Sequence, residues 1–251
     1  MTRRPPPTSP RTAAADAEDA LRARRVSLLG RWYAAGSDAA KQNAIVDEFE
    51  PIAKANAADL PLTALAVQLR RSDANAAAAK RLDDIATNVM QNDLATRYKA
   101  ELEASAKLKA LEGKPMVIAG KLPDGRDFST ADWKGKVILV DFWAVSCAPC
   151  RAELPRVKKA YAEFHDKGFE VLGVSNDYSA NTLNGYVQQQ AMPWPNLFDA
   201  EAAADKSWNP ITTGFGIHAI PTMFLIDKAG NCRTISARED FESQIPKLLA
   251  E

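Results

Sequence analysis

The stretch of residues 137–155 reads VILVDFWAVSCAPCRAELP, and it decides the fold class. Its first seven residues are mostly β-branched, aliphatic or aromatic, a pattern typical of a strand buried in a central sheet. Cys147 and Cys150 follow closely, with two residues between them. A helix is predicted next, over about 148–166. The stretch thus predicts a cysteine pair at the point where a buried strand passes into a helix.

The position of the cysteine pair predicts its chemistry. Cys147 falls at the first turn of the predicted helix, where unpaired backbone N–H groups and the macrodipole stabilise an anion. We expect its pKa to fall to about 3.5–7.5, below that of a free cysteine, so that a thiolate exists at neutral pH. Cys150 lies one helical turn further along, where it can attack a mixed disulfide on Cys147 and release the substrate. Pro149 fits, since its missing N–H would be unpaired at an early helical position.

Composition divides the chain into three parts. Residues 1–12 are rich in proline, serine and threonine, which predicts a disordered arm. Residues 13–112 are rich in alanine and poor in glycine, which predicts an all-α domain. Residues 114–251 alternate between strand and helix patterns. This last part predicts an α/β fold, with a parallel or mixed sheet and helices on both faces.

The alanine-rich part shows four helical segments. The first is predicted over 13–35, and the second is interrupted by Pro51. The third spans about 61–71. The fourth runs from about 74 to 111 with Asp73 as its N-cap, and its apolar face shifts by a five-residue step near its middle.

The alternating part contains turn signals between apolar runs. Asp124-Gly125 predicts a hairpin that leads to a second short strand. The other predicted strands are 115–120, 137–143, 169–175, 222–227 and 232–236, and the predicted helices are 148–166, 180–190, 200–208 and 239–250.

Several segments together resemble thioredoxin-like proteins, and most closely the TlpA/ResA group of thiol–disulfide oxidoreductases. The CxxC and the Arg-Ala-Glu-Leu-Pro that follows it carry the closest likeness. The further segments are the turn at 124–126, the strand end 174–177 with 193–195, and residues 216–227. The resemblance covers about 114–251. It implies a thioredoxin-like central mixed sheet flanked by helices and a protein disulfide reductase or dithiol–disulfide oxidoreductase, and no cofactor is expected.

The resemblance also implies roles for single residues. Pro221 would be a cis-proline that faces the cysteine pair, and Ile220 would offer its backbone to a substrate peptide. Asp141 and Glu153 are two candidates for taking the proton from Cys150 during resolution. The branch of the family favours Glu153, whereas Asp141 stands on the better buried element.

Ser146 departs from the family pattern, which usually has tryptophan just before the first cysteine. A hydroxyl therefore replaces a flat apolar shield beside the nucleophile. Ser146, Pro149, Ile220 and Pro221 form the predicted substrate-binding set. The departure bears on substrate preference and redox poise rather than on the exchange chemistry.

Composition and charge argue against several functional classes. The 32 basic residues balance 32 acidic ones, so no nucleic-acid partner is expected. No metal site is expected either, because His165 and His218 are the only histidines and lack paired ligand spacing. Three cysteines are too few for a disulfide scaffold, and Cys232 is predicted to be a passive thiol.

The start of the sequence bears on location. It lacks the apolar core of a signal peptide, and no run of the chain is long and apolar enough for a membrane-spanning helix. The family resemblance favours an extracytoplasmic location, in the periplasm or cell envelope, with a signal or anchor removed. A cytoplasmic location is the alternative.

Three functions stay open at this point. The leading hypothesis is an enzyme that exchanges disulfides with protein substrates and is served by an upstream redox partner. The second is a partner-binding or assembly module, in which the helical part mediates protein contact or oligomerisation. The third, a peroxiredoxin-type peroxidase, is disfavoured because the reactive cysteine of such enzymes stands alone after Pro-x-x-x-Thr.

Overall fold

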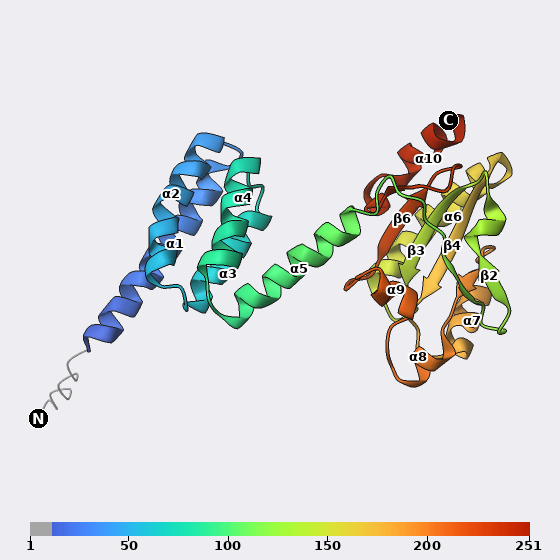
Figure 1. The fold of residues 1–251 in the computed structure, drawn as a ribbon, viewed down its shortest axis with the longest axis horizontal. Coiled ribbons are helices and arrows are strands. Elements are labelled where there is room, and N and C mark those ends of the chain that lie inside the picture. The colour runs from blue at the N-terminus through green and yellow to red at the C-terminus, as the bar shows by residue number, and fades with distance from the viewer. Residues whose placement is uncertain (1–11) are drawn as a thin grey trace, which may run out of the picture. The chain divides into compact units, whose positions relative to one another are not determined.

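The computed structural model describes residues 12–251, and Figure 1 shows its elements. The chain forms two compact units, one up to Leu102 and one from Glu103 onward. The predicted disordered arm, residues 1–12, lies outside the described residues except for Thr12. The Thr12 hydroxyl accepts a hydrogen bond from a backbone N–H of the first helix and so caps it.

Between residues 12 and 102, the first unit is built of helices alone. Trp32, Phe49 and Leu62 lie in one apolar core, which the helices surround. The predicted helical N-terminal region is thereby confirmed. The elements are α1 (Ala13–Ala35), α2 (Ala39–Ala55), α3 (Leu60–Arg71), α4 (Ala76–Asp84), a π-helical turn η1 (Ile85–Val89) and α5 (Asp93–Lys109), which continues into the second unit.

The predicted interruption at Pro51 is wrong, because α2 continues through it to Ala55. Proline removes one backbone hydrogen bond from a helix interior and crowds the preceding turn. Phe49 and Ile52 are nevertheless buried in the core on either side of it. Packing of this face therefore outweighs the local cost of the proline.

The single long helix predicted over 74–111 is also wrong. The π-helical turn follows α4, Met90 is extended with a ψ of 141°, and α5 starts afresh at Asp93. The Asn92 side chain accepts a hydrogen bond from the backbone N–H of Ala95 and supplies the new N-cap. The five-residue step in the apolar pattern marks this break, because a regular 3.6-residue period cannot absorb it.

The prediction of Asp73 as the N-cap of that segment is also wrong. Asp73 has a φ of 50°, in the left-handed region, and lies before the helix. Asn75 caps α4 instead, since its side chain accepts hydrogen bonds from the backbone N–H groups of Ala77 and Ala78.

The second unit is built on a five-stranded mixed sheet (Figure 1). The central strand β3 (Val137–Trp143) runs parallel to β4 (Phe169–Ser175) and antiparallel to β6 (Thr222–Ile226). The edges are β5 (Asn196–Leu197), parallel to β4, and β7 (Cys232–Thr234), antiparallel to β6. The predicted thioredoxin-like mixed sheet is confirmed.

Helices and a hairpin cover both faces of this sheet. On one face, Leu139 of β3 packs with Val157 of α6 and Phe241 of α10. On the other face, Val140 and Phe142 pack with residues around α9 and the hairpin. The covering elements are β1 (Ala119–Lys121), β2 (Asp127–Ser129), η2 (Thr130–Trp133), α6 (Ala148–Phe164), η3 (His165–Lys167), α7 (Ala180–Gln189), α8 (Ala200–Ala204), α9 (Pro210–Gly214), η4 (Ala237–Glu239) and α10 (Phe241–Ala250).

Two predicted elements of this unit are shorter than expected. The strand over 115–120 is reduced to β1 and to a single bridge between Pro115 and Asn231. The helix over 200–208 ends at Ala204, and a separate helix α9 follows. The Asn209 side chain caps α9 by accepting from a backbone N–H, so that the chain turns between the two helices.

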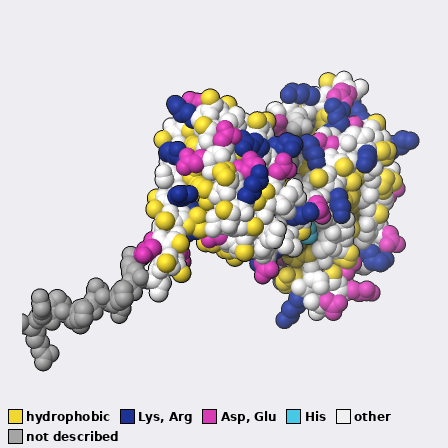
Figure 2. Space-filling model, turned by 60° about the vertical axis from the view of Figure 1, so that its left-hand side comes forward, with side chains coloured by type: hydrophobic (Ala, Val, Ile, Leu, Met, Phe, Trp, Pro, Cys, Tyr) yellow, Lys and Arg dark blue, Asp and Glu magenta, His cyan; other side chains and the backbone are white. Residues whose placement is uncertain are grey.

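Figure 2 shows basic and acidic side chains mixed over the face in view, in keeping with the balanced charge of the sequence. Between residues 12 and 251, no helix has both the length and the apolar content to span a bilayer. The same residues hold no group of three or more His, Cys, Asp or Glu side chains placed to bind a metal ion.

Candidate active site

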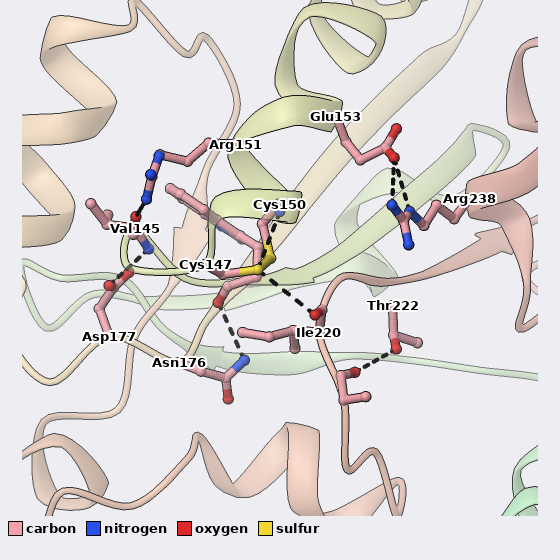
Figure 3. Close-up of a disulfide and its surroundings, with 12 residues drawn as sticks. Val145, Cys147, Cys150, Arg151, Glu153, Asn176, Asp177, Ile220, Thr222 and Arg238 are labelled. Carbon is pink, nitrogen blue, oxygen red and sulfur yellow. Dashed lines mark hydrogen bonds and ion pairs between the residues drawn. A yellow bond between two sulfur atoms is a disulfide. The ribbon is translucent and has the colours of Figure 1, made fainter.

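The cysteine pair lies where β3 passes into α6 (Figure 3). Cys147 is the N-cap of α6, and its Sγ accepts a hydrogen bond from the backbone N–H of Cys150 at 3.2 Å. The two sulfur atoms form a disulfide of 2.04 Å, with the Cα atoms 5.3 Å apart. Pro149 is accommodated in the first turn, where no backbone partner is lost.

The two sulfurs differ in their access to solvent. Cys150 is 4% exposed and packs with Leu154 and Val157 in the core beneath α6. Cys147 is partly exposed, and Ser146 and Pro149 beside it are exposed. An incoming molecule can therefore reach the sulfur of Cys147 but not that of Cys150.

A second segment faces the disulfide from the start of β6. The peptide bond between Ile220 and Pro221 is cis. The carbonyl oxygen of Ile220 lies 3.7 Å from Cys147 Sγ, as Figure 3 shows. The Thr222 hydroxyl donates to the Ala219 carbonyl at 2.8 Å and holds this turn together. The fold thus brings a backbone carbonyl from a distant part of the chain next to the accessible sulfur.

Asp141 lies inside the sheet on the central strand, opposite Gly173 and Met223. Asp141 is two residues from Leu139 and two from Trp143, so all three side chains lie on the same face of the sheet. This is the face that α6 covers. The residue keeps some exposed surface, but its Oδ1 is buried and makes no hydrogen bond. Burial raises the pKa of Asp141 to about 7, the negative charge of Glu153 adds to this rise, and Arg238 opposes it.

Glu153 lies on α6, one turn after Cys150, and is 9% exposed. Its Oε2 accepts from Arg156 Nη1 at 2.6 Å, and its Oε1 accepts from Arg238 Nε at 2.9 Å. Figure 3 shows the Arg238 guanidinium turned toward this carboxylate. Arg156 is itself held by Glu242 through two hydrogen bonds of 2.7 Å. Two guanidinium groups therefore fix the position of the Glu153 side chain.

The loop before the disulfide is fixed by polar contacts (Figure 3). The Val145 carbonyl accepts from Arg151 Nη1 at 2.5 Å, and the Val145 N–H donates to Asp177 Oδ1 at 2.9 Å. Cys232, in contrast, is fully buried on β7, outside this group of residues. Burial raises the pKa of its thiol to about 11, so it stays protonated at neutral pH.

A family model described as the AhpC/TSA family matches residues 93–235, which is more than half of the chain. The chain belongs to the AhpC/TSA family. This match begins in α5, before the start of the region near residue 114 in which the motifs were found.

The relatives of this AhpC/TSA protein that are named here are both described as thiol-disulfide oxidoreductase ResA. Thiol-disulfide oxidoreductase ResA of Bacillus cereus is 27% identical over 154 residues, which are 61% of this chain and 84% of that protein. The protein of the same name from Bacillus anthracis is 32% identical over 107 residues, 43% of this chain and 58% of that protein. The predicted TlpA/ResA-like membership is thereby confirmed.

Solved structures are similar to the same part of this AhpC/TSA protein. A thiol:disulfide interchange protein from a Bacteroides species is 26% identical, with a TM-score of 0.49, over 57% of this chain and 93% of its own. A thioredoxin family protein from Chlorobium tepidum is 28% identical, with a TM-score of 0.45, over 55% of this chain and 99% of its own.

The structure adds residues that sequence reasoning missed. Arg156 and Arg238 hold Glu153, and Asp177 holds the loop before Cys147. Arg156 lies three residues after Glu153, a spacing that permits contact on a helix but does not demand it. Arg238 is 85 residues from Glu153, and nothing in the sequence pairs the two. Only the fold reveals that contact.

Proposed function

We propose that this protein exchanges thiols and disulfides with other proteins through Cys147 and Cys150. One observation carries the proposal. An accessible sulfur at the N-cap of α6 lies within bonding distance of a buried second sulfur. The ResA relatives, described as thiol-disulfide oxidoreductases, support the same activity.

The reaction follows from the geometry in two steps. In the reduced protein, the Cys147 thiolate attacks one sulfur of a substrate disulfide and expels the other as a thiolate, which leaves a mixed disulfide. Cys150, after losing its proton, then attacks Cys147 Sγ and releases the second substrate thiol. Two electrons pass to the substrate, and the disulfide seen in the structure is the product.

Asp141 is the proposed acceptor for the Cys150 proton. Its pKa of about 7 allows it to take and return a proton near neutral pH, and its carboxylate has a free oxygen on the α6 side of the sheet. Glu153, which the family resemblance favours, is held in place by Arg156 and Arg238. Its proposed role is to raise the pKa of Asp141 by its charge.

Four residues around Cys147 are proposed to meet the substrate. Ile220 offers its backbone carbonyl beside the sulfur, in reach of an N–H of an extended substrate chain. Pro221 follows Ile220 through the cis peptide bond and is proposed to contact the same substrate segment. Ser146 and Pro149 flank the sulfur on the α6 side and are exposed.

The wider organisation is proposed on the same basis. Residues 114–251 form the redox domain, residues 13–112 form a helical domain, and an upstream dithiol protein returns Cys147 and Cys150 to the reduced state. The TlpA/ResA resemblance supports an extracytoplasmic location. Fractionation of cells that express the full gene tests it, and recovery of the protein with cytoplasmic markers would contradict it.

A reduction assay tests the main proposal. The protein should catalyse reduction of insulin by dithiothreitol, and Cys147→Ser should abolish the catalysis. Cys232→Ala is the matched control, because it removes a cysteine that is buried outside the site. Equal turnover by Cys147→Ser and the unaltered protein would refute the proposal. Rapid consumption of hydrogen peroxide would instead support the peroxidase alternative.

A partner-binding function of the helical unit is the second candidate. A hollow of about 550 Å³ on this unit is lined by residues of α1 and α2, among them Leu21, Pro51 and Ile52. Deletion of residues 1–112 tests it: capture of a partner protein should be lost. Unchanged capture by the remaining part would defeat this candidate.

A further inference from the structure

A hollow of about 430 Å³ opens beside the accessible sulfur. Ser146, which precedes Cys147, and Ile220, whose carbonyl oxygen faces its sulfur, are both part of the lining. Tyr178 and Trp208 line the hollow as well. The hollow is thus continuous with the place where a substrate disulfide must dock.

Four loops of the chain contribute to this hollow, and buried polar groups tie three of them together. The backbone and side-chain N–H groups of Asn176 both donate to the Trp143 carbonyl, at 2.9 and 3.3 Å. The Asn176 side-chain oxygen accepts from the backbone N–H of Asn209 at 3.1 Å. Asp177 joins the loop of Val145 in the same way. The walls of the hollow are therefore fixed before any substrate arrives.

The aromatic side chains of Tyr178 and Trp208 belong to none of the apolar core clusters formed by the described residues. Tyr178 is 53% exposed, and Trp208 is half-buried. Among the hydrogen bonds and ring contacts found in residues 12–251, none involves either side chain. Exposed aromatic surface that is held beside a reactive group is typical of a recognition site.

The lining of the hollow offers no free charge. Its one carboxylate, that of Asp177, is buried and accepts hydrogen bonds from Val145 N–H and from the Ser175 hydroxyl. An apolar side chain would gain free energy by leaving water there, whereas a charged one would lose its hydration without finding a partner. The small side chain of Ser146 leaves the entrance from Cys147 open.

We infer that the hollow beside Ser146 binds an apolar, preferably aromatic, side chain next to the target cysteine of an extended polypeptide substrate. The inference rests on the proposed function and names a substrate class for it. Tyr178 and Trp208 are its specificity-determining residues. Disulfides whose cysteines have only small or acidic neighbours should react through the same sulfurs, but more slowly.

Single-turnover reduction of short peptide disulfides tests the inference. The protein is first reduced with dithiothreitol and desalted, so each turnover converts its dithiol to the disulfide and one peptide disulfide to two thiols. The probes are symmetric disulfides of blocked tripeptides with Phe, Ala or Glu on either side of the cysteine. Hydroxyethyl disulfide, which has no neighbouring side chain, is the reference.

We expect the Phe peptides to react about tenfold faster than the Ala peptides, and the Glu peptides to react no faster than the Ala peptides. The double variant Tyr178→Ala/Trp208→Ala should reduce the Phe advantage to less than about twofold, with an unchanged rate for hydroxyethyl disulfide. Tyr178→Phe, which keeps the ring, should retain the advantage. Tyr178→Ala alone serves as the test if the double variant slows the reference reaction.

Two results would overturn the inference. One is an equal rate for Phe and Ala peptides, and the other is a Phe advantage that survives in the alanine variants. Both leave hydroxyethyl disulfide reduction intact, and so leave the proposed function standing. Loss of that reference reaction in the unaltered protein would instead refute the proposed function itself.

Discussion

The helical unit and the thioredoxin-like unit bury different kinds of polar group. In the helical unit, between residues 12 and 102, the buried polar side chains are the uncharged Gln42 and Thr63. Some of its ion pairs, such as Lys80 with Asp84, are well exposed, and others, such as Arg25 with Asp59, are partly buried. Water therefore solvates the charges of the exposed pairs, and each of those pairs adds little to stability.

The thioredoxin-like unit buries carboxylates. The Oδ1 atom of Asp141 is shielded from solvent and makes no hydrogen bond. The buried acidic residues of this unit are Glu153, Glu170, Asp177 and Asp227. Burial of a charged group costs free energy unless the charge is well paired, so an unpaired carboxylate is a strong indication of chemistry.

Gln42 and Asp141 show what the difference teaches. Gln42 donates to the carbonyls of Gly36 and Asp73 and accepts from the backbone and side chain of Asn75, so its amide is fully used in joining loops. Asp141 has a carboxylate oxygen without a hydrogen bond, and the residue lies on the face of the sheet that α6 covers. A satisfied buried group stabilises a fold, whereas an unsatisfied titratable one is available to exchange a proton.

Removal of the Asp141 carboxylate should give the largest effect. Asp141→Asn cannot accept the Cys150 proton, so we expect turnover in disulfide reduction near pH 7 to fall by about a hundredfold. In the unaltered protein, the rate of the resolving step should rise as pH increases through about 7, and the variant should lose this rise. A pH series of rapid-mixing experiments measures it. An unchanged pH profile would contradict the assignment.

Asp141→Asn, which should lower turnover, should increase the stability of the fold. The folded pKa of about 7 lies above the ordinary value of 3.8, so the folded state favours the protonated carboxyl. Stability is therefore lost as pH rises from about 4 to 7, and this penalty is fully present above pH 7. Asp141→Asn should raise the free energy of unfolding at pH 8 by a few kcal/mol and have little effect at pH 4. Denaturant titrations at both pH values check this.

Gln42→Ala should destabilise the helical unit without touching the chemistry. It leaves the backbone groups of Gly36, Asp73 and Asn75 without their buried partner, which should cost about 3 kcal/mol of unfolding free energy. Thermal denaturation measures this loss, and the insulin-reduction rate below the melting temperature should be unchanged. A large loss of activity in a variant that keeps its full helical content would contradict the claim that Gln42 contributes only to stability.

Arg238→Ala should have a moderate effect that depends on pH. Arg238 lowers the pKa of Asp141, so its removal should shift the pH profile of the resolving step to higher pH. Arg233→Ala is the matched control, because Arg233 pairs with Asp227 and Glu251 at the edge of the sheet. A shift of equal size in both variants would show only a general charge effect.

Exposed ion pairs of the helical unit should give the smallest effect. Lys80→Ala breaks the ion pair between Lys80 and Asp84, and both of these side chains are well exposed. We expect a change in unfolding free energy of about 0.5 kcal/mol or less, measured by urea denaturation. A loss several times larger would show that surface charges contribute to this unit far more than its geometry indicates.

The sequence indicated the chemistry of the thioredoxin-like unit because local motifs carry it. A strand, a CxxC and a helix within residues 137–155 determine where both sulfurs lie, and the family resemblance predicts that Pro221 faces them. The contact of Arg238 with Glu153 spans 85 residues and left no trace in any local pattern. Without knowledge of this contact, the sequence could not decide between Glu153 and Asp141 as the proton acceptor.

In the helical unit, the apolar pattern predicted the elements better than it predicted their ends. Trp32 of α1 and Phe49 of α2 lie in the core, whereas Ala17 near the start of α1 is exposed. The course of α2 through Pro51 and the break at Met90 depend on packing between helices. Tertiary contacts decide such points, and local propensity does not.

The ionisation of Cys147 tests the central claim most directly. Alkylation of the reduced protein with iodoacetamide across a pH series, read by mass spectrometry at each cysteine, gives the pKa of the exposed thiol. The account predicts that residue 147 reacts first and titrates clearly below the value of about 8.5 for free cysteine, because the start of α6 stabilises its thiolate. Titration at the free-cysteine value, or faster alkylation of residue 150, would contradict it.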